Sequence, residues 1–591
     1  MLRPWQETFV KESLREISSK ESVVIAIESP TGSGKTLTAL KILERSLIEG
    51  YAKKGYFLVR TSTQVIPPIR DAEKFELKLQ LMPLVGKEKS CPLGSSIVNM
   101  CKECPWRDRI AGPPVSWTKV FEWIESTKRS NKCPYMSMRR LIDNYDVVVM
   151  PYAYLTPSIA NAMKFEVKDS ILVFDEAHNV FNFMREEEIE VTSVKKLISK
   201  LPNFLRYVHE RMGVHIDSES LIEVMKSLKR MLKELEAYQA ISGKSVRVRE
   251  IKDSIGPEIS LLRKDLESIV SLLAFNSDPK YDIGEKVLSI IKALELLRER
   301  DTMAYYERGV LKIKELRPWI SKYVDRVRGI ILLSGTMPSK EFLERAIGRV
   351  DLYLSLFEMK SELEEYFKLY RPENVEVIIV TDYTSKYKVR YDLSMIKARE
   401  MVEEATFRLV DLLNGIGLLV YPSFSMLKAV KSDLLVTSKK TGVPLVFNER
   451  GRGSEVLNRA KALGKCVIAA VARDQLTEGI EITENGRSLI KVVSVIGAPY
   501  PLPSPFLEDV AKALGDKDGS VLWKLYEEEM LMRVKQAIGR LVRNPEDKGI
   551  VILADNRFSN FKNELGKYRK LHEVTASQLL QAVRSETSRR R

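Results

Sequence analysis

Short runs of apolar residues, each ending in glycine or polar residues, recur along both halves of the chain. In the first half they are residues 22–28, 56–60, 146–150, 171–174 and 330–334. A second series follows Pro372, with the runs VEVIIV, GLLVY, CVIAAVA, VVSVIG and IVILAD. Such runs are typical of parallel strands covered on both faces. The pattern therefore predicts an α/β protein with two parallel-sheet units of similar size.

A different pattern separates the strands predicted at 171–174 and 330–334. In the segment LIEVMKSLKRMLKELEAY (221–238) the apolar residues recur at helical spacing and share one face. The same spacing returns at Leu262, Leu266, Ile269 and Leu273. This pattern predicts residues 190–315 as a helical insertion in the first unit.

The size and charge of the chain narrow its class. A length of 591 residues suggests about three or four domains. Lys and Arg exceed Asp and Glu by 95 − 80 = +15, which favours a polyanionic partner such as nucleic acid, although an ordinary basic surface explains it equally well. The N-terminus lacks the apolar core of a signal peptide, and no apolar run approaches the roughly 18 residues of a membrane span. We expect a cytoplasmic protein, or a nuclear one in a eukaryote, with no membrane partner.

The segment SPTGSGKT (29–36) lies between a predicted strand and a predicted helix. It matches the phosphate-binding loop G-x-x-x-x-G-K-[ST] except that Ser29 replaces the first glycine. Glycines let backbone N–H groups surround phosphate oxygens, Lys35 reaches the β- and γ-phosphates, and Thr36 places a hydroxyl on Mg²⁺. The loop residues expected to bind ATP are Ser29, Thr31, Gly32, Ser33, Gly34, Lys35 and Thr36.

Two adjacent carboxylates follow the predicted strand at 171–174, in the segment ILVFDEAH. Asp175 at the strand end can hold Mg²⁺, directly or through water, and Glu176 can orient and deprotonate an attacking water. A solvated acidic turn is the alternative. Together with the phosphate-binding loop, the pair predicts a nucleoside triphosphatase.

A third element lies about 500 residues further on, in VKQAIGRLVR (534–543). If this segment is helical, Gln536, Arg540 and Arg543 share one face. Arginines that reach a γ-phosphate from the second unit would couple hydrolysis to closure of the cleft. A solvated basic helix edge is the plain alternative.

Four of the five cysteines gather between residues 91 and 133, with the spacing C-x9-C-x2-C-x28-C. Spacing alone allows Cys91, Cys101, Cys104 and Cys133 to bind Zn²⁺ or to hold a [4Fe–4S] cluster. Residues 86–140 also carry eleven Lys and Arg against five Asp and Glu, and three of the six tryptophans. Such a surface could stack or wedge bases where strands part, with Tyr135 and Arg139 as candidates; packing in a small core explains at least two of the tryptophans.

The motifs SPTGSGKT, RTSTQ (60–64), DEAH, SGT (334–336), TEGIE (477–481), GAPYP (497–501) and QAIGRLVR (536–543) follow in the order found in superfamily 2 helicases. The set resembles the XPD/DinG-type, iron–sulfur branch, whose archaeal members are most similar in length and insert order. The resemblance implies an ATP- and Mg²⁺-dependent DNA helicase that moves 5′→3′ on single-stranded DNA and unwinds forked duplexes in DNA repair. It favours a [4Fe–4S] cluster over zinc, and a monomer that can bind repair proteins.

The same resemblance implies two RecA-like motor domains, with an iron–sulfur domain and a helical arch inserted into the first. The implied boundaries are 1–85, 141–189 and 316–372 for motor domain 1, 86–140 for the iron–sulfur domain, 190–315 for the arch and 373–591 for motor domain 2.

Further site residues rest on the resemblance alone. It implies DNA contacts at Arg60, Thr61, Thr477 and Glu478, and an adenine contact at Gln6, for which a buried amide that caps its own helix is a comparable alternative. Asp555 and Arg557 match a family D-x-R element. Asp474 and Gln475 stand where relatives often carry Gly-Lys or Gly-Arg, so a phosphate contact at that step is not expected.

Two other functions fit the sequence. A DNA-stimulated ATPase that remodels protein–DNA complexes without unwinding would need the same motor residues. A redox-sensing DNA-binding protein with a vestigial ATPase is the second alternative, and intact Lys35, Glu176 and Arg540 argue against it.

Overall fold

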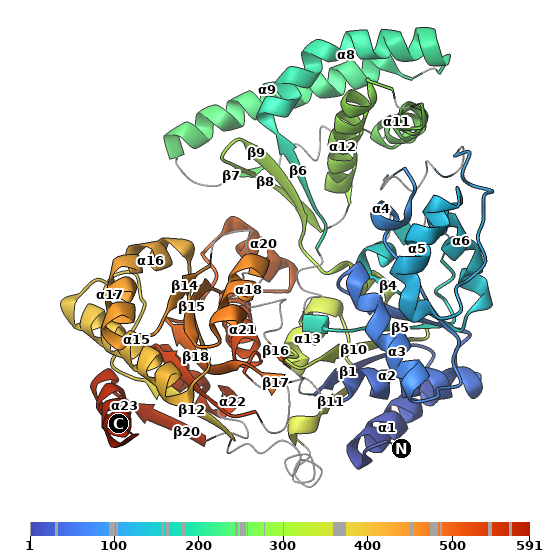
Figure 1. The fold of residues 1–591 in the computed structure, drawn as a ribbon. Coiled ribbons are helices and arrows are strands. Elements are labelled where there is room, and N and C mark those ends of the chain that lie inside the picture. The colour runs from blue at the N-terminus through green and yellow to red at the C-terminus, as the bar shows by residue number, and fades with distance from the viewer. Residues whose placement is uncertain are drawn as a thin grey trace. The chain divides into compact units, whose positions relative to one another are not determined.

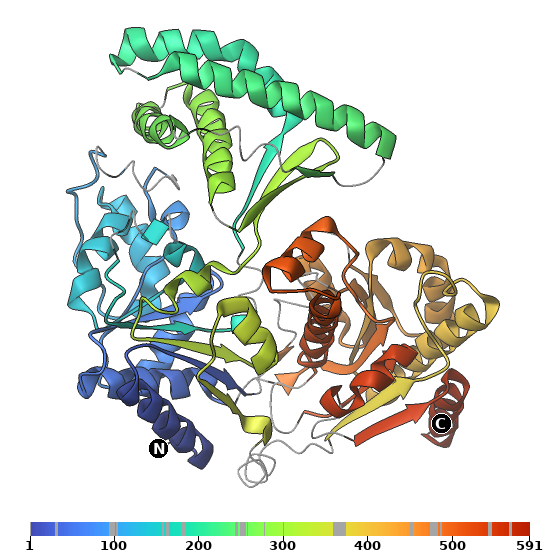
Figure 2. The ribbon, with the colours of Figure 1, turned by 180° about the vertical axis from the view of Figure 1, so that it is seen from behind.

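The computed structural model describes residues 2–29, 33–93, 101, 104–156, 159–160, 163, 165–178, 184–214, 216–242, 246–248, 256, 258–276, 278–299, 301–358, 374–448, 453–472, 483–484, 487–541, 547–565 and 570–590. The chain forms two compact units (Figures 1 and 2). Unit 1 comprises Met1–Ile27, Lys35–Leu354 and Pro503–Leu522, and unit 2 comprises Glu28–Gly34, Ser355–Leu502 and Trp523–Arg591. Each unit is built on one seven-stranded sheet.

The first sheet contains all five strands predicted for the first half of the chain. Its strands, in spatial order, are β11 (Leu352–Ser355), β1 (Val23–Glu28), β10 (Gly329–Ser334), β5 (Ser170–Phe174), β2 (Lys54–Val59), β4 (Val147–Pro151) and β3 (Leu81–Pro83). Strands β1, β5, β4 and β10 are buried along their whole length, as their uninterrupted apolar sequences predict. The nearby helices are α1 (Pro4–Ser19), α2 (Lys35–Ile48), α3 (Ile66–Lys74) and α13 (Lys340–Ile347).

A small cysteine lobe, residues 87–141, lies between β3 and β4 in the chain. Its described helices are α4 (Lys87–Ser90), α5 (Val120–Arg129) and α6 (Pro134–Leu141). Trp117 is buried and meets Trp123 edge to face, with ring centroids 5.4 Å apart. Trp117 also donates from Nε1 to the Tyr145 hydroxyl at 3.0 Å. These two tryptophans therefore form the small core that the sequence suggested for at least two of the three.

The helical insert, residues 186–315, connects β5 with β10. It contains the two predicted helices, α9 (Ser218–Ser242) and α11 (Glu258–Phe275), together with α8 (Val191–Met212) and α12 (Tyr281–Arg298). An antiparallel sheet, which the helical prediction did not include, completes the insert (Figure 1). Its strands, in spatial order, are β6 (Glu186–Glu190), β9 (Val310–Glu315), β8 (Thr302–Glu307) and β7 (Val246–Val248). Apolar residues of the helices and strands pack into one core.

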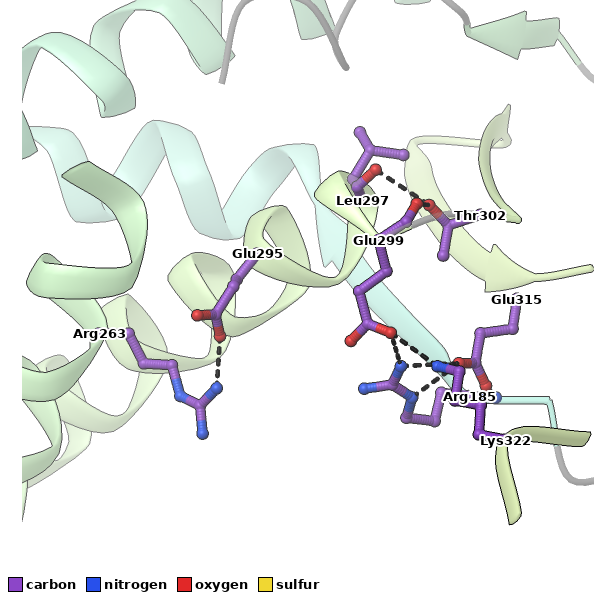
Figure 3. Close-up of polar contacts among 8 residues, drawn as sticks. All are labelled: Arg185, Arg263, Glu295, Leu297, Glu299, Thr302, Glu315 and Lys322. Atoms are coloured by element: carbon purple, nitrogen blue, oxygen red, sulfur yellow. Dashed lines mark hydrogen bonds and ion pairs between the residues drawn. The ribbon is translucent and has the colours of Figure 1, made fainter. Parts of the chain in front are cut away.

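The base of the insert is held by four charged residues, which we call the root cluster: Arg185, Glu299, Glu315 and Lys322 (Figure 3). Arg185 lies where the chain enters the insert. It donates from its backbone N–H and its Nε to the Glu315 carboxylate, at 2.9 and 3.1 Å. Its guanidinium also meets Glu299. Lys322, beyond the insert in the 3₁₀ turn Trp319–Tyr323, lies 2.8 Å from Glu299 and 3.2 Å from Glu315. Two cations thus balance two carboxylates where the chain enters and leaves the insert.

The second sheet is parallel throughout. Its strands, in spatial order, are β14 (Leu445–Phe447), β15 (Cys466–Val471), β13 (Ile416–Tyr421), β18 (Ile490–Ile496), β19 (Gly549–Ala554), β12 (Val375–Val380) and β20 (Lys570–Val574). They include all five strands predicted for this half. Cores form on both faces, one with α15 (Leu393–Leu413), α16 (Phe424–Ala429), α17 (Lys431–Thr441) and α23 (Ala576–Arg590), the other with α18 (Gly453–Leu463) and α21 (Ser520–Ile538). The predicted fold class is therefore confirmed.

The contacts of residues 503–522 group them with unit 1, although they fall within the predicted second motor domain, residues 373–591. This segment contains α20 (Pro505–Ala513). The predicted domain boundaries themselves stay predictions. Within the part of the chain that the structure describes, no helix is long and apolar enough to cross a membrane.

Candidate functional site

The order of strands in the first sheet gathers three of the sequence motifs. Strands β1, β10 and β5 are neighbours in the sheet. The phosphate-binding loop follows β1, SGT follows β10, and DEAH follows β5. Ligands of parallel α/β sheets bind beyond the carboxyl ends of the strands. The fold therefore brings three motifs that are far apart in sequence to one edge of one sheet.

Lys35, Glu176, His178 and Ser334 form a continuous chain of polar contacts at this edge. Lys35, the first residue of α2, is buried, and its Nζ lies 3.1 Å from Glu176 Oε1. The other carboxylate oxygen of Glu176 lies 3.4 Å from His178 Nδ1. The same His178 nitrogen lies 2.8 Å from the Ser334 hydroxyl oxygen. Glu176 has a φ of +53°, an uncommon conformation for a residue with a side chain.

The described part of the phosphate-binding loop is compact. Ser29 and Ser33 are fully buried, and their hydroxyl oxygens lie 3.1 Å apart. Gly34 has a φ of +98°, which explains why glycine stands immediately before the helix. Thr36 is half-buried in the first turn of α2. The predicted ATP contacts Thr31 and Gly32 lie outside the described residues.

Asp175 lies between the strand end and Glu176. One of its carboxylate oxygens is buried and has no hydrogen-bond partner among the described residues. Burial, together with the adjacent Glu176 carboxylate, raises the pKa of Asp175 to about 6, although the Lys35 ammonium opposes the rise. A cation is the partner that would satisfy such an oxygen, so the donor set fits the predicted Mg²⁺ contact.

Gln6 lies in the first turn of α1 and is buried. Its side-chain oxygen accepts a hydrogen bond from the backbone N–H of Arg3 at 2.9 Å. This contact forms part of a capping box. The structure thus contains the alternative that the sequence left open for Gln6, and the adenine contact stays a prediction.

The predicted DNA contacts divide into described and undescribed residues. Arg60 and Thr61 follow β2 and are exposed. Thr61 donates from its backbone N–H to Gln64 Oε1 at 3.0 Å, which shapes the turn after the strand. Thr477 and Glu478, with Asp474 and Gln475, lie outside the described residues. The DNA contacts therefore stay predictions.

The continuous helix considered for residues 534–543 is not formed. Helix α21 ends at Ile538, and Arg540 follows in a turn, where its N–H bonds to the carbonyl of Ala537. Gln536 lies on the helix and has a buried side-chain oxygen with no hydrogen-bond partner among the described residues. Arg543 lies outside the described residues. Gly539 supplies the physical reason for the correction, because glycine favours the end of a helix over its interior.

Asp555 organises a second set of motifs in unit 2. It is fully buried and accepts from Arg557 Nε at 2.8 Å and from the hydroxyl and the backbone N–H of Ser385 at 2.8 and 2.9 Å. Burial alone would raise the pKa of Asp555, but the Arg557 guanidinium and the N–H donors of Ser385 and Ala498 hold it below its ordinary value. The Arg557 guanidinium also lies 5.0 Å from the ring centroid of Tyr500, in GAPYP.

The four predicted ligand cysteines are gathered in the cysteine lobe. Cys91, Cys101 and Cys133 are buried, and Cys104 is half-buried. Burial, with a smaller contribution from the other three cysteines, raises the pKa of the Cys133 thiol to about 11, against the hydrogen bond from the Met136 backbone N–H. Among the described residues, no three His, Cys, Asp or Glu side chains are arranged to hold a single metal ion. The donor set of four neighbouring thiols, without histidine or carboxylate, nevertheless fits a four-thiolate group.

Sequence reasoning missed a buried lysine beside these thiols. Lys87 is buried, and its Nζ lies 5.6 Å from the ring centroid of Tyr135. Burial raises the pKa of the Cys101 thiol, and a hydrogen bond from Lys87 opposes that rise. Its position four residues before Cys91 was the available signal, but a lysine in a basic segment does not stand out.

The surface role predicted for Tyr135 is wrong in this structure. Tyr135 is fully buried, and its hydroxyl lies 3.1 Å from the sulfur of Met163. The reason is that α6 packs this face into the protein directly after Cys133 caps the helix. Arg139, one turn further on, is half-buried, and its DNA contact stays a prediction.

Three family models match parts of the chain. Residues 1–81 match the model "Type III restriction enzyme, res subunit", residues 85–196 match DEAD_2, and residues 406–570 match the helicase C-terminal domain. The first two cover the phosphate-binding loop, the cysteine lobe and DEAH, and the third covers most of unit 2.

Relatives and solved structures agree with these matches. The chain is 27% identical to the ATP-dependent DNA helicase XPD of Sulfolobus acidocaldarius, over 95% of this chain and 96% of that protein. It is 24% identical to the ATP-dependent DNA helicase CHL1 of Candida albicans, over 74% of this chain but only 59% of the longer protein. A solved structure of an XPD helicase superimposes with a TM-score of 0.70 at 23% identity, covering 97% of this chain and all of the other. The Xpd4 structure of S. tokodaii gives a TM-score of 0.58 at 18% identity, with 96% of this chain covered.

Proposed function

We propose that the chain is an ATP-dependent DNA helicase of the XPD type, a proposal supported by its similarity to an XPD helicase over 95% of its length and by its matches to the DEAD_2 and helicase C-terminal models. It moves 5′→3′ along single-stranded DNA, unwinds forked duplexes and serves DNA repair. Both the XPD and the CHL1 relatives carry the name of ATP-dependent DNA helicases, which supports the activity. Polarity and pathway rest on the family alone.

The contacts from Lys35 through Glu176 and His178 to Ser334 carry the proposal. They join a phosphate-binding lysine, an acid that can act on water, and a motif at the end of the strand between them. An ion pair between Lys35 and Glu176 holds both groups in place before nucleotide binds. When ATP enters, its phosphates compete for the Lys35 ammonium, and Glu176 becomes free to act as the base.

Hydrolysis then follows from groups of this chain. Glu176 accepts a proton from the attacking water, the new bond forms between the water oxygen and the γ-phosphorus, and the bond to the β,γ-bridging oxygen breaks with its electron pair leaving on ADP. Thr36 and Asp175 would hold Mg²⁺, which supplies charge neutralisation at the phosphates. His178 contacts both Glu176 and Ser334, so it couples the position of the Glu176 carboxylate to the SGT motif.

In this proposal, unit 2 supplies the second motor domain and its γ-phosphate contacts. Gln536, Arg540 and Arg543 sense the γ-phosphate, and the two sheets act as the two RecA-like motor domains. The buried, unpartnered oxygen of Gln536 is the described feature that supports a ligand there.

The cysteine lobe is assigned as the iron–sulfur domain and the helical insert as the arch. Cys91, Cys101, Cys104 and Cys133 would hold a [4Fe–4S] cluster, which supplies covalent cross-links to a lobe with a small core of its own. The mutual influence of the four thiols on the pKa of Cys133 supports this ligand set.

Strand displacement on matched substrates tests the helicase proposal. Duplexes with a 5′ or a 3′ single-stranded tail are mixed with protein, ATP and Mg²⁺, and phosphate release is followed in parallel. We expect displacement from the 5′-tailed duplex and DNA-stimulated phosphate release, both abolished by Lys35→Ala. DNA-stimulated hydrolysis without displacement from either tail would favour the remodelling ATPase, and DNA binding without hydrolysis would favour the redox sensor.

A further inference from the structure

Helix α20 lies on the helical insert, although the chain on both sides of it belongs to unit 2. Residues 503–522 are grouped with unit 1, whereas Ser355–Leu502 and Trp523–Arg591 form most of unit 2. The contacts of this segment are thus made within unit 1, whereas the chain before and after it is grouped with unit 2. We call residues 503–522 the strap.

Asp509 is the centre of the contact between the strap and the insert. Its side chain is 6% exposed. One carboxylate oxygen accepts from Arg247 Nε of β7 at 2.6 Å and from the Tyr305 hydroxyl of β8 at 2.9 Å. A buried carboxylate loses much of its solvation, so it stays in place only while such donors are present. The contact is therefore specific, and removal of one partner weakens it strongly.

Contacts at both ends of α20 reinforce this centre. At the first turn, Phe506 meets Tyr305 edge to face at 5.8 Å, and Lys314 Nζ lies 4.8 Å from the Phe506 ring centroid. At the last turn, the carbonyl of Ala513 accepts a hydrogen bond from Arg317, just beyond β9. The first and last turns of α20 thus both contact residues of the insert or residues directly after it.

The base of the strap is closed within unit 2. Tyr500, upstream of the strap, stacks on Trp523, downstream of it, with ring centroids 5.8 Å apart and planes 20° from parallel. The Pro499 carbonyl also accepts a hydrogen bond from the buried Arg533 of α21. Because the two ends are tied together, the strap is a closed loop whose base belongs to one unit and whose tip belongs to the other.

The same helix that closes the base also carries Gln536. Helix α21 begins at Ser520, inside the strap, and runs through Trp523 and Arg533 to the turn before Arg540. Helix α21 therefore connects the base of the strap with the predicted γ-phosphate contact Gln536.

We propose that the strap is a mechanical link that transmits nucleotide-dependent movement of α21 to the helical insert through Asp509, Arg247 and Tyr305. Asp509 is a positioning residue, since it acts through its contacts with Arg247 and Tyr305 of the insert. The inference rests on the proposed function for the nucleotide response of α21, which carries the predicted γ-phosphate contact Gln536, and for the unwinding of DNA; the contacts of the strap are a property of the fold.

Unwinding per ATP hydrolysed tests this consequence. In the full-length protein we expect Asp509→Ala and Arg247→Ala to keep DNA-stimulated ATP turnover within about twofold of the unmodified chain and to lower strand displacement at least fivefold. The loss in the double variant should be smaller than the two single losses combined, because both substitutions remove the Arg247–Asp509 ion pair, although Asp509 also loses Tyr305 and Arg247 also loses Glu508. Lys195→Ala, which removes an exposed ion pair with Glu236 inside the insert, should change neither rate. Equal losses of both rates, or no loss of displacement, would overturn the proposal.

A distance measurement tests the link without any unwinding. Fluorophores on unnatural amino acids at Lys229 of the insert and Lys439 of unit 2, both exposed, report the separation before and after a non-hydrolysable ATP analogue is added. We expect a change in the unmodified chain and in Lys195→Ala, and a smaller change in Asp509→Ala and in Tyr305→Phe, which keeps the packed ring. The same change in all four proteins would refute the link, even if the unmodified chain unwinds no DNA and the helicase proposal fails.

Discussion

His178 Nδ1 and the Ser334 hydroxyl oxygen lie 2.8 Å apart, and this contact joins the DEAH motif after β5 to the SGT motif after β10. Both residues are buried. Ser334 also accepts from the backbone N–H of Thr336 at 3.0 Å, which fixes its hydroxyl. The histidine that touches the candidate base Glu176 is therefore held by a neighbouring strand.

Ser334→Ala should slow ATP hydrolysis without unfolding the protein. Loss of one hydrogen bond costs about 1 kcal/mol, so we expect DNA-stimulated turnover to fall about 3- to 10-fold. Phosphate release measures this effect. Ser18→Ala, which removes an exposed hydroxyl of α1, is the matched control. An equal effect of both substitutions would contradict a role for the contact chain from Lys35 to Ser334.

Cys133→Ser should remove the metal content of the cysteine lobe. Freshly purified protein should be brown and contain about four irons per chain, and the variant should lose the colour and most of the iron. Cys466→Ala is the control, because Cys466 is a buried thiol in β15 of unit 2. Colourless protein that contains stoichiometric zinc would show that the four cysteines bind zinc and not an iron–sulfur cluster.

Glu403 should make unit 2 less stable as the pH rises. Its carboxylate is fully buried on α15 and accepts from the Tyr421 hydroxyl at 2.6 Å. Burial raises its pKa from 4.5 to about 7, although Arg399 and Tyr421 oppose the rise. The stabilisation is full below the unfolded value of 4.5 and is lost as the pH rises through about 7, because the unfolded chain ionises first. The loss is on the order of 3 kcal/mol.

Urea unfolding of unit 2 between pH 4.5 and 8 measures this dependence. Glu403→Gln keeps an acceptor for Tyr421 but cannot ionise, so its free energy of unfolding should lose most of the downward slope. Glu400→Gln, at a half-exposed carboxylate on the same helix, should retain the slope. Parallel curves for all three proteins would show that Glu403 is not the responsible group.

Glu315→Gln should loosen the base of the helical insert. The Glu315 side chain is 4% exposed and pairs with Arg185 and Lys322 in the root cluster (Figure 3). Removal of one buried charge leaves the others partly unpaired, so we expect the insert to lose about 2 kcal/mol or more of stability. Native-state proteolysis of the insert reports this loss. Glu188→Gln breaks an exposed pair with Lys312 on the same sheet and should cost under about 1 kcal/mol; equal protease sensitivity of the two variants would argue against the cluster.

The sequence predicted the elements of the two sheets because a buried parallel strand has a distinctive apolar run. All ten predicted strands are present. The sheet of the helical insert escaped prediction for the opposite reason. Strand β6, EEEIE, has one buried apolar residue, and β7 has only three residues. Neither sequence can be distinguished from a loop by its pattern of apolar residues.

The candidate site was predictable where a motif implies both chemistry and position. Lys35, Asp175 and Glu176 meet because their strands are near neighbours in the sheet. Tyr135 shows the limit, since a tyrosine after a cysteine can face solvent or the core, and packing decides between them. The Asp509 contact was equally beyond prediction, because its partners come from sequence positions more than 200 residues away.

Strand displacement from a 5′-tailed duplex, by the unmodified chain and by Glu176→Gln side by side, decides whether ATP hydrolysis at this site drives unwinding. We expect ATP- and Mg²⁺-dependent displacement by the unmodified chain, no displacement from the matched 3′-tailed duplex, and no displacement by the variant even though it still binds ATP. Hydrolysis of ATP by the unmodified chain on the 5′-tailed duplex, with no strand released, would contradict it.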